Sequence, residues 1–518
     1  MLATECMGSY MTTSVFQFLE ENAVRFPDKT ALNDDRHSVT FAEWLDAARR
    51  IGSAIAVDAH GAMRRPVMVF VDRRIEPLVA FLGVVASGNF YVPIDCKMPA
   101  ERLKYIIGVL NPLAAITVTA EDDALLDAVG YAGTRYWFEV AKVHQIEEET
   151  LARIMGELID LDPVYCIFTS GSTGVPKGVL VPHRGIIDLA EWIFSRFGMT
   201  SEDVIGEQGP FYFDGSVKDV LICLKGGATM HIIPKKCFSF PKLLTKFLNE
   251  KKVTSLWWAT SAINLAANSG ILEIDPPKYV RIVTFGGESI LPKQLNAWRK
   301  AVPNAMFVNL YGPTEASVDS TYYVVDREFL DTDTIPIGRH CENKNVLVLT
   351  DDNREATVGE TGELCMRGSG LSLGYYNDSE RTAAAFVQNP LHNLYADRIY
   401  RTGDLVKYNE RGELVFVSRK DFQIKHMGYR IELGEIEAAV NAIDGVANAA
   451  CVYDREHECI VLFYTSVDNE EKDIINLVKN RLPKYMFPEK IIRLETMPFN
   501  ANGKIDRVKL GESLAISR

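Results

Sequence analysis

Short apolar runs alternate with amphipathic segments through the first two thirds of the chain. Val15, Phe18, Leu19 and Val24 recur at helical spacing, so the sequence predicts an opening helix over residues 14–26. After it, strand-length apolar runs are followed by stretches with helical periodicity. The predicted strands include 65–71, 114–119, 165–170, 228–234 and 279–287, and the predicted helices include 76–88, 185–197, 241–252 and 292–302. Buried strands alternating with helices predict an α/β fold with largely parallel sheets covered on both faces.

The pattern changes near residue 345. Residues 344–368 and 405–420 alternate apolar and polar positions around Gly and Asn/Asp turns, which predicts hairpins in a smaller β-rich region. From about residue 421 the order becomes helix, strand, helix, over 434–446, 459–467 and 473–483. This order predicts a compact α+β domain, with a boundary near residues 418–421.

Length, charge and cysteine spacing narrow the class of protein. The 518 residues exceed what one hydrophobic core usually holds, so two or more domains are expected. The formal net charge of -13 argues against nucleic acid or an anionic membrane as a partner. The nine cysteines include no C-x-x-C pair, and no secretory signal or membrane-length apolar run is present. We therefore expect reduced thiols and a cytoplasmic protein.

The run "FTSGSTGVPKGVLVPH" at 168–183 carries the first chemical signal. Glycines allow several backbone N–H groups to point at one anion, hydroxyl groups add donors, and a lysine adds positive charge. The common phosphate-loop pattern is not met, because Lys177 follows Pro176 and precedes Gly178. Alone, this composition also suits a flexible surface loop. The predicted phosphate-binding residues are Thr169, Ser170, Gly171, Ser172, Thr173, Gly174 and Lys177.

Together with this loop, eight further segments resemble, in order, the motifs of the adenylate-forming enzyme superfamily. They are "VTFAEW" (39–44), "ASGNFYVPID" (86–95), "NLYGPTEAS" (309–317), "GELCMRGSGLSLGYYN" (362–377), "YRTGDL" (400–405), "SRKDFQIKHMGYRIELGEIE" (418–437), "LPKYMFP" (482–488) and "NGKID" (502–506). This superfamily includes acyl-CoA ligases, luciferase-like enzymes and the adenylation domains of nonribosomal peptide synthetases. Nine motifs in the right order make the resemblance specific.

The resemblance implies the acyl-adenylate-forming fold. A large N-terminal domain (1–417), with parallel-rich sheets flanked by helices and a β-rich subdomain, would precede a small mobile C-terminal α+β domain (422–518). The hinge would span 418–421, with Asp421 at the pivot. The small domain would rotate between an adenylating state that presents Lys504 and a thioester-forming state that presents the 418–430 segment. Ser418 departs from the glycine that most members have there.

The resemblance also implies roles in binding ATP and Mg²⁺. Lys504 would be the catalytic lysine that contacts the substrate carboxylate and the α-phosphate, where two anions must meet. Tyr311 would stack on adenine, Asn309 would bond its edge, and Glu315 would hold Mg²⁺. The remaining ATP-binding residues would be Gly287 and Glu288 at the adenine, Gly312, Thr314 at the α-phosphate, and Asp404 and Arg419 at the ribose or phosphate.

Asp214 in "FYFDGSVKDVLICL" matches the aspartate with which amino-acid-activating members bind the substrate α-ammonium. An N-cap role is the structural alternative. By the same resemblance, the side-chain pocket would be lined by Gly215, Lys218, Thr260, Thr284, Gly286, Leu310, Val318 and Asp319. Lys218 could bind a substrate carboxylate or other polar group, or could pair internally with Asp214 or Asp319. We expect a small or polar amino acid rather than a large aromatic one.

The expected activity is ATP-dependent formation of an aminoacyl-adenylate with release of pyrophosphate. Transfer to the phosphopantetheine thiol of a carrier protein or domain would follow. A D-alanine–carrier-protein ligase, an acyl-CoA or aryl-acid ligase, and an inactive nucleotide-binding protein are the alternatives. The chain could act alone or be a domain of a longer synthetase.

Overall fold

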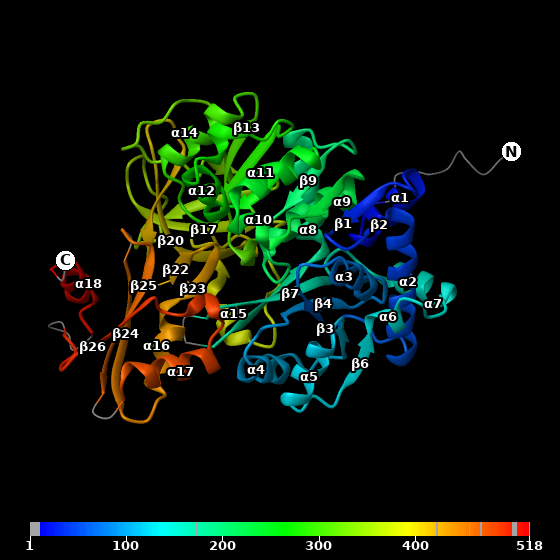
Figure 1. The fold of residues 1–518 in the computed structure, drawn as a ribbon, viewed down its shortest axis with the longest axis horizontal. Helices are drawn as coiled ribbons and strands as arrows, with labels where there is room; N and C mark the ends of the chain where they lie inside the picture. The colour runs from blue at the N-terminus through cyan, green and yellow to red at the C-terminus, as the bar shows by residue number, and fades with distance from the viewer. Residues whose placement is uncertain are drawn as a thin grey trace.

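The computed structural model describes residues 11–171, 175–420, 423–454, 456–466, 469–499 and 505–516. Two large sheets with their helices and a smaller antiparallel sheet form the bulk of the molecule (Figure 1). A small domain, orange to red in Figure 1, lies on one side of them. The architecture is the α/β fold that the sequence predicts.

The first sheet has nine strands among the described residues. Across the sheet they are β15 (Arg339–His340), β14 (Thr321–Val324), β13 (Met306–Tyr311), β12 (Ile282–Gly286), β11 (Ser255–Ala259), β9 (Val204–Glu207), β10 (Thr229–Ile232), β1 (Thr30–Asn33) and β2 (Ser38–Thr40). The six strands from β13 to β1 pair in parallel, and the edge strands pair antiparallel. The parallel centre confirms the prediction from alternating strands and helices.

The second sheet has seven strands in the part of the chain that the structure describes. They are β18 (Gly374–Tyr375), β8 (Lys177–Pro182), β7 (Pro163–Thr169), β4 (Phe90–Asp95), β3 (Pro66–Val71), β5 (Ala114–Thr117) and β6 (Thr134–Trp137). The sequence did not predict β8, which pairs antiparallel with β7 and sets Thr169 opposite Lys177. Its backbone groups are satisfied by the preceding strand, a tertiary contact that periodicity cannot reveal.

The helices of the large domain cover these two sheets. They are α1 (Phe16–Arg25), α2 (Phe41–Asp58), α3 (Glu76–Ala86), α4 (Ala100–Leu110), α5 (Ala120–Ala128), α6 (Phe138–Ala141), α7 (Glu148–Glu157), α8 (His183–Phe197), α9 (Val217–Gly226), α10 (Lys235–Ser239), α11 (Pro241–Glu250), α12 (Thr260–Asn268), α13 (Ile271–Ile274) and α14 (Pro292–Ala301). Short 3₁₀ turns, η1 (Asp214–Ser216) and η2 (Thr314–Ala316), lie near strand ends.

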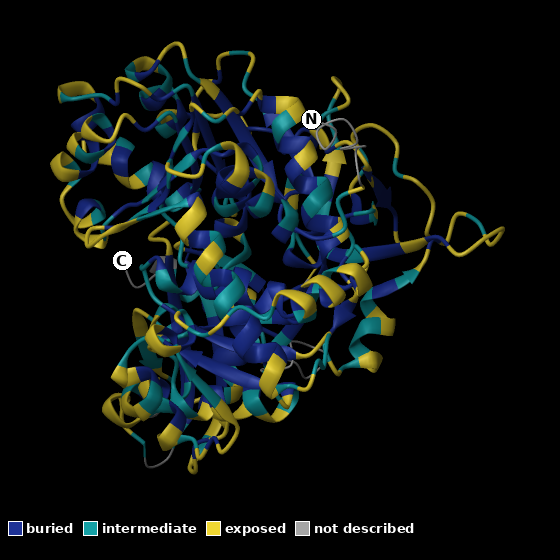
Figure 2. Cartoon of the chain, turned by 90° about the vertical axis from the view of Figure 1, so that its right-hand side faces the viewer, coloured by how far each residue is buried: buried dark blue, intermediate teal, exposed yellow. Residues whose placement is uncertain are grey.

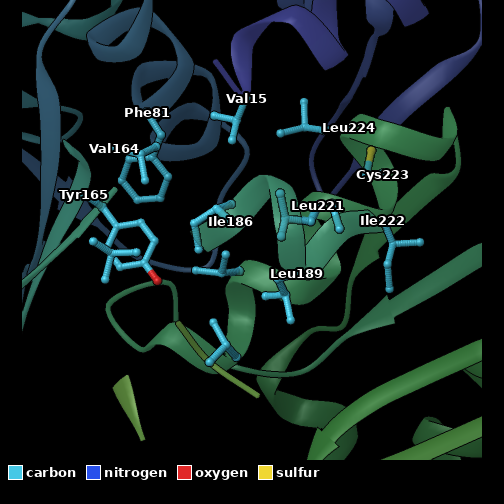
Figure 3. Close-up of a cluster of buried hydrophobic side chains, with 14 of the residues drawn as sticks. Val15, Phe81, Val164, Tyr165, Ile186, Leu189, Leu221, Ile222, Cys223 and Leu224 are labelled. Atoms are coloured by element: carbon cyan, nitrogen blue, oxygen red, sulfur yellow. The ribbon is translucent and has the colours of Figure 1, made fainter. Parts of the chain in front are cut away.

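One continuous core joins the two sheets. Figure 3 shows Phe81 of α3 and Tyr165 of β7 close to Ile186 and Leu189 of α8, with Leu221 of α9 beyond them. All five side chains are almost completely buried. This shared apolar layer fixes β7, and therefore the loop that follows it, relative to α9.

The β-rich region is an antiparallel sheet of β16 (Lys344–Leu349), β17 (Gly362–Gly368), β20 (Arg398–Tyr408), β19 (Phe386–Gln388) and β21 (Leu414–Arg419), with α15 (Ser379–Ala385) beside it. The hairpins β16–β17 and β20–β21 confirm the two predicted from Gly and Asn/Asp turns. Ser418 and Arg419 belong to β21, so the predicted hinge begins at the end of a paired strand. The domain limits themselves stay a prediction.

The small domain begins with a hairpin of β22 (Gln423–His426) and β23 (Tyr429–Glu432). It continues with α16 (Leu433–Asn441), β24 (Val446–Asp454), β25 (Cys459–Ser466), α17 (Glu471–Arg481), η3 (Lys484–Met486), β26 (Lys490–Arg493) and α18 (Arg507–Ile516). Ile436, Leu462 and Ile474 lie in its own core. The predicted helix, strand and second helix are α16, β25 and α17.

Burial follows the layers: buried residues fill the interiors and exposed residues lie on the outer helices and loops (Figure 2). Seven of the eight described cysteines are buried, and none of the eight forms a disulfide. Within the described part of the chain, no helix has both the length and the apolar character needed to cross a bilayer.

Candidate active site

A cavity of about 190 Å³ lies between the large domain and the small domain. Its floor includes Ala259, Gly286 and Leu310, which stand in register at the carboxyl ends of β11, β12 and β13. Ligands of open α/β sheets bind at this end of parallel strands. The β22–β23 hairpin closes the cavity from the other side, contributing Lys425 and Arg430.

The structure brings most of the predicted residues together at this cavity. Those that line it are Thr169, Ser170, Asp214, Gly215, Lys218, Gly286, Gly287, Leu310, Tyr311, Gly312, Thr314, Val318, Asp319, Asp404 and Arg419. Segments separated by up to 250 residues thus meet at one place. Ser172, Thr173, Gly174, Asp421 and Lys504 lie outside the described residues, and their roles stay predictions.

Lys177 and Glu315 form a buried ion pair next to the cavity. Lys177 Nζ lies 2.8 Å from Glu315 Oε1, and the Tyr375 hydroxyl donates to the same oxygen at 3.0 Å. Arg430 of the small domain lies 2.7 Å from Glu315 Oε2. Burial alone would raise the pKa of Glu315, but Arg430 and Lys177 hold that pKa well below its usual range.

These residues fit a magnesium-bound polyphosphate. Thr169 Oγ1 is buried without a hydrogen-bond partner among the described residues, which leaves a donor for a phosphate oxygen. Glu315 offers the hard oxygen that Mg²⁺ prefers, once Arg430 is withdrawn. Within the described chain, no cluster of three or more His, Cys, Asp or Glu side chains could hold a metal.

Tyr311, Asp404 and Arg419 form a second polar group along the cavity. The Tyr311 hydroxyl donates to one oxygen of Asp404, and Arg419 Nη1 donates to the other at 2.5 Å. Lys425 Nζ lies over the Tyr311 ring, which is predicted to stack on adenine, at 5.2 Å from the ring centroid. This places a cation of the small domain over a residue that is predicted to bind the nucleotide.

Two residues that are predicted to contact adenine form hydrogen bonds with other groups of the protein in this structure. The Asn309 side-chain amide donates to Pro336 O at 2.8 Å, and Glu288 Oε1 accepts from the backbone N–H of Gly428 at 2.7 Å. Neither residue lines the cavity in this arrangement. Their contacts with a nucleotide stay predictions.

Asp214 also lines the cavity, at the first position of η1. Phe213 is the N-cap of η1 and Ser216 that of α9, so Asp214 occupies neither cap position, which speaks against the N-cap alternative. Burial raises its pKa, and the facing Thr314 hydroxyl and Lys218 oppose that rise. A carboxylate in this position is available to an ammonium group.

Lys218 forms the internal pair with Asp319 rather than with Asp214. Lys218 Nζ lies 3.3 Å from Asp319 Oδ1, with the two side chains 8% and 5% exposed. No other hydrogen-bond partner of the ammonium occurs within the described chain, and Asp319 Oδ2 has none. Two N–H donors of a buried cation are thus left for a ligand.

Trp257, rather than Thr260 or Thr284, contributes the side chain at the pocket wall. Trp257 and Trp258 line the cavity, whereas the Thr260 hydroxyl donates to Gly286 O and Glu288 O. Thr284 is fully buried and pairs in register with Trp257. The sequence reasoning missed Trp257, although its place in β11, two residues before Ala259, puts both on one face of the strand.

The loop that carries Val318 and Asp319 has a strained backbone. Ser317 and Val318 have φ values of 52° and 68°, a region that a β-branched residue rarely adopts. The buried Lys344 Nζ holds this loop by donating to Ala316 O at 2.9 Å, Ser317 O at 3.0 Å and Asp319 O. Lys344 therefore positions the pocket wall, a role that the sequence analysis did not predict.

Gly312 is required by close packing of this same loop. A Cβ at this position would lie 2.0 Å from Val318 O. We expect Gly312→Ala to destabilise the fold by about 1–3 kcal/mol and to displace Val318. Thermal denaturation measures the effect, with Gly215→Ala as the control, because a Cβ at Gly215 meets nothing within 4 Å. Equal stability of the two variants would contradict this interpretation.

Several small-domain residues at the cavity had no individual role in the sequence analysis. They are Gln423, Lys425, Met427, Gly428, Tyr429, Arg430 and Tyr485. Tyr429 stacks on Tyr485 with ring centroids 4.2 Å apart, and Phe213 meets Tyr429 edge to face at 4.9 Å. The motifs at 418–437 and 482–488 contain all of these residues, so the resemblance identified the segments but not the contacts that their side chains make.

Comparison with known proteins gives two family matches. Residues 19–376 match the model described as AMP-binding enzyme, and residues 435–504 match that of the AMP-binding enzyme C-terminal domain. Tyrocidine synthase 1 of Brevibacillus parabrevis is 30% identical over 96% of this chain and 45% of its own length. The chain thus spans less than half of that relative.

Two further comparisons cover nearly the whole chain. Zwittermicin A synthase ZmaJ of Bacillus cereus is 31% identical over 96% of this chain and 94% of its own. The structure of holo-PA1221, an NRPS protein containing adenylation and PCP domains, matches 96% of this chain and 84% of its own with a TM-score of 0.80 and 25% identity. With its ordered motifs, its two-part match and this fold, the chain belongs to the AMP-binding enzyme family.

Proposed function

We propose that the protein activates an amino acid with ATP and transfers the aminoacyl group to a carrier protein. An oxygen of the amino-acid carboxylate attacks the α-phosphorus, and the bond to the bridging oxygen breaks as pyrophosphate leaves. The phosphopantetheine thiol of the carrier then displaces AMP from the acyl carbon and loses its proton. Mg²⁺, when bound, supplies positive charge to the phosphate oxygens, and Glu315 is its predicted ligand.

The observation that carries the proposal is the position of Asp214. Its carboxylate shares a cavity with Thr169 and Ser170 of the phosphate loop and with Tyr311 and Asp404. An ammonium bound there would leave the amino-acid carboxylate free to face the α-phosphate. Peptide synthases among the relatives, and the adenylation and PCP domains of PA1221, support both steps. Buried thiols that form no disulfide are consistent with a reducing compartment. We therefore include a cytoplasmic location in the proposal.

An ATP–pyrophosphate exchange screen tests the first step. It should cover the proteinogenic amino acids and D-alanine, with fatty and aromatic acids that lack an α-amine as comparison. Exchange that depends on one or a few amino acids is expected, because only they carry the ammonium that pairs with Asp214. Exchange confined to acids without an amine would overturn the proposal in favour of an acyl-CoA or aryl-acid ligase.

Lys218 is proposed to select a side chain that carries an oxygen acceptor. Two N–H donors of its ammonium have no partner among the described residues. The side chains of Trp257, Leu310 and Val318 form apolar walls of the same cavity. Lys218→Met should lower kcat/KM for the preferred polar amino acid by about 10–100-fold, because a site built to hydrogen-bond a ligand loses that bond. Competing amino acids without the acceptor should lose much less.

Asp319→Asn serves as the matched variant for this prediction. It weakens the internal pair but keeps the lysine, so the preference for an oxygen-bearing side chain should remain. An unchanged ranking of amino acids in Lys218→Met would show that the lysine serves only the ion pair with Asp319.

A further inference from the structure

The predicted side-chain pocket holds a buried ion pair whose two charges cancel. Lys218 Nζ lies 3.3 Å from Asp319 Oδ1, and both residues line the cavity. Among the described residues, the ammonium keeps two N–H donors without a partner, and Asp319 Oδ2 accepts no hydrogen bond. The pair therefore has both donors and an acceptor left over, but no net charge.

A second carboxyl group lines the same cavity. Asp219 follows Lys218 on α9, is almost completely buried, and its Oδ1 has no hydrogen-bond partner among the described residues. Burial raises the pKa of Asp219 well above its usual range, Glu207 adds to that rise, and Lys218 opposes it. A ligand carboxylate placed beside Lys218 would therefore meet two acidic side chains, Asp219 and Asp319, and only one cation.

The backbone around Asp319 is held by another buried lysine. Lys344 Nζ donates to Asp319 O, to Ala316 O at 2.9 Å and to Ser317 O at 3.0 Å. Asp319 cannot move away from Lys218 without breaking bonds between a buried ammonium and these carbonyl groups. The ion pair is thus a fixed feature of the pocket, and the ligand has to match it.

We infer that the pocket selects an amino acid whose side chain ends in a carboxamide, as in asparagine and glutamine. The amide oxygen would accept from Lys218, and the amide N–H groups would donate to Asp319 Oδ2. A side-chain carboxylate would bring an uncompensated charge into this buried site, and an apolar side chain would leave its polar groups unpaired. The inference rests on the proposed activation of an amino acid.

Two sets of amino acids with matched shapes test this inference on the unmodified protein. Asparagine, aspartate and leucine have side chains of nearly the same shape, and glutamine, glutamate and methionine have nearly the same length. In the set that fits the pocket, kcat/KM in ATP–pyrophosphate exchange should be about 10²-fold or more higher for the amide than for either other member. A best substrate with a carboxylate, hydroxyl or apolar side chain would overturn the inference.

Two single variants test whether the charges of the ion pair set this preference. Asp319→Asn leaves Lys218 as an uncompensated cation, so the ratio of kcat/KM for the carboxylate to that for the amide should rise about 10²-fold. Lys218→Met leaves the acid without its cation, so the same ratio should fall. Because both substrates are measured in one preparation, the ratio does not depend on the fraction of folded protein. An unchanged ratio in both variants would overturn the inference.

A control and a double variant complete the series. Lys225 lies on the same helix but pairs with Glu191 and does not line the cavity, so Lys225→Met should leave the ratio unchanged. The double variant Lys218→Met, Asp319→Leu replaces the pair with apolar side chains, a change that proteins usually tolerate even where loss of one partner unfolds them. In this variant the apolar amino acid should become the best of its set. A retained preference for the amide would overturn the inference.

The exchange measurements separate the failure of this inference from the failure of the proposed function. Exchange that is strongest with an amino acid lacking a side-chain amide would leave the function in place and remove the inference. Exchange confined to acids without an α-amine would remove both. Exchange that is strongest with asparagine or glutamine would support both.

Discussion

Replacing Lys504 with alanine is expected to lower amino-acid-dependent ATP–pyrophosphate exchange by about 10²–10³-fold, because a cation would be lost where two anions meet at the α-phosphorus. ATP binding should change little, since its adenine, ribose and terminal phosphates have other predicted partners. Exchange kinetics and calorimetric titration with ATP measure the two effects separately.

The control for this variant is Lys509→Ala, which removes an exposed lysine from α18 of the same domain. It should keep normal exchange. Near-normal exchange in Lys504→Ala would contradict the catalytic assignment. Because Lys504 lies outside the described residues, this prediction stands on the sequence motif and on the charge argument alone.

Asp214→Asn is expected to lower kcat/KM for the amino acid by about 10²-fold. The variant keeps the shape of the side chain but removes the charge that would pair with the α-ammonium, and truncating a buried charge pair costs about 2–5 kcal/mol. The affinity for ATP should be nearly unchanged. Exchange kinetics at varied amino-acid concentration measure the loss.

The pH dependence of the unmodified protein gives an independent check on Asp214. Burial raises the pKa of this carboxyl group, and only its ionised form attracts an ammonium. The apparent KM for the amino acid should therefore rise as pH falls through that raised pKa. In Asp214→Asn this rise should be absent, and retention of the full pH dependence would assign it to another group.

Local patterns predicted much of the fold because burial imposes periodicity within one segment. The parallel strands β3, β5, β7 and β12, and the helices α1, α3 and α8, follow directly from apolar spacing. Strand β8 was missed because its partner β7, not its own composition, decides its conformation. In the small domain, β22, β23, β24 and β26 were missed for the same reason: their pairing depends on neighbours.

The residues of the candidate site also divide into those that sequence motifs predicted and those that only the structure revealed. Thr169 and Ser170 of the phosphate loop and most residues of "NLYGPTEAS" reach the cavity, because each belongs to a motif in which local chain geometry and chemistry coincide. Trp257 was missed in favour of Thr260 because the face that β11 presents depends on its register with β12. Lys344 was missed because its three carbonyl partners lie in another segment.

The sequence by itself determined the α/β class and the family resemblance, and it predicted the phosphate loop and the aspartate for an amino group. Only the tertiary structure decided that Lys218 pairs with Asp319, 101 residues away, and that Arg430 pairs with Glu315, 115 residues away. The physical reason is that burial and turn chemistry act over a few neighbouring residues and leave a readable pattern. Partners of buried charges are chosen by the packing of whole domains, which no local pattern encodes.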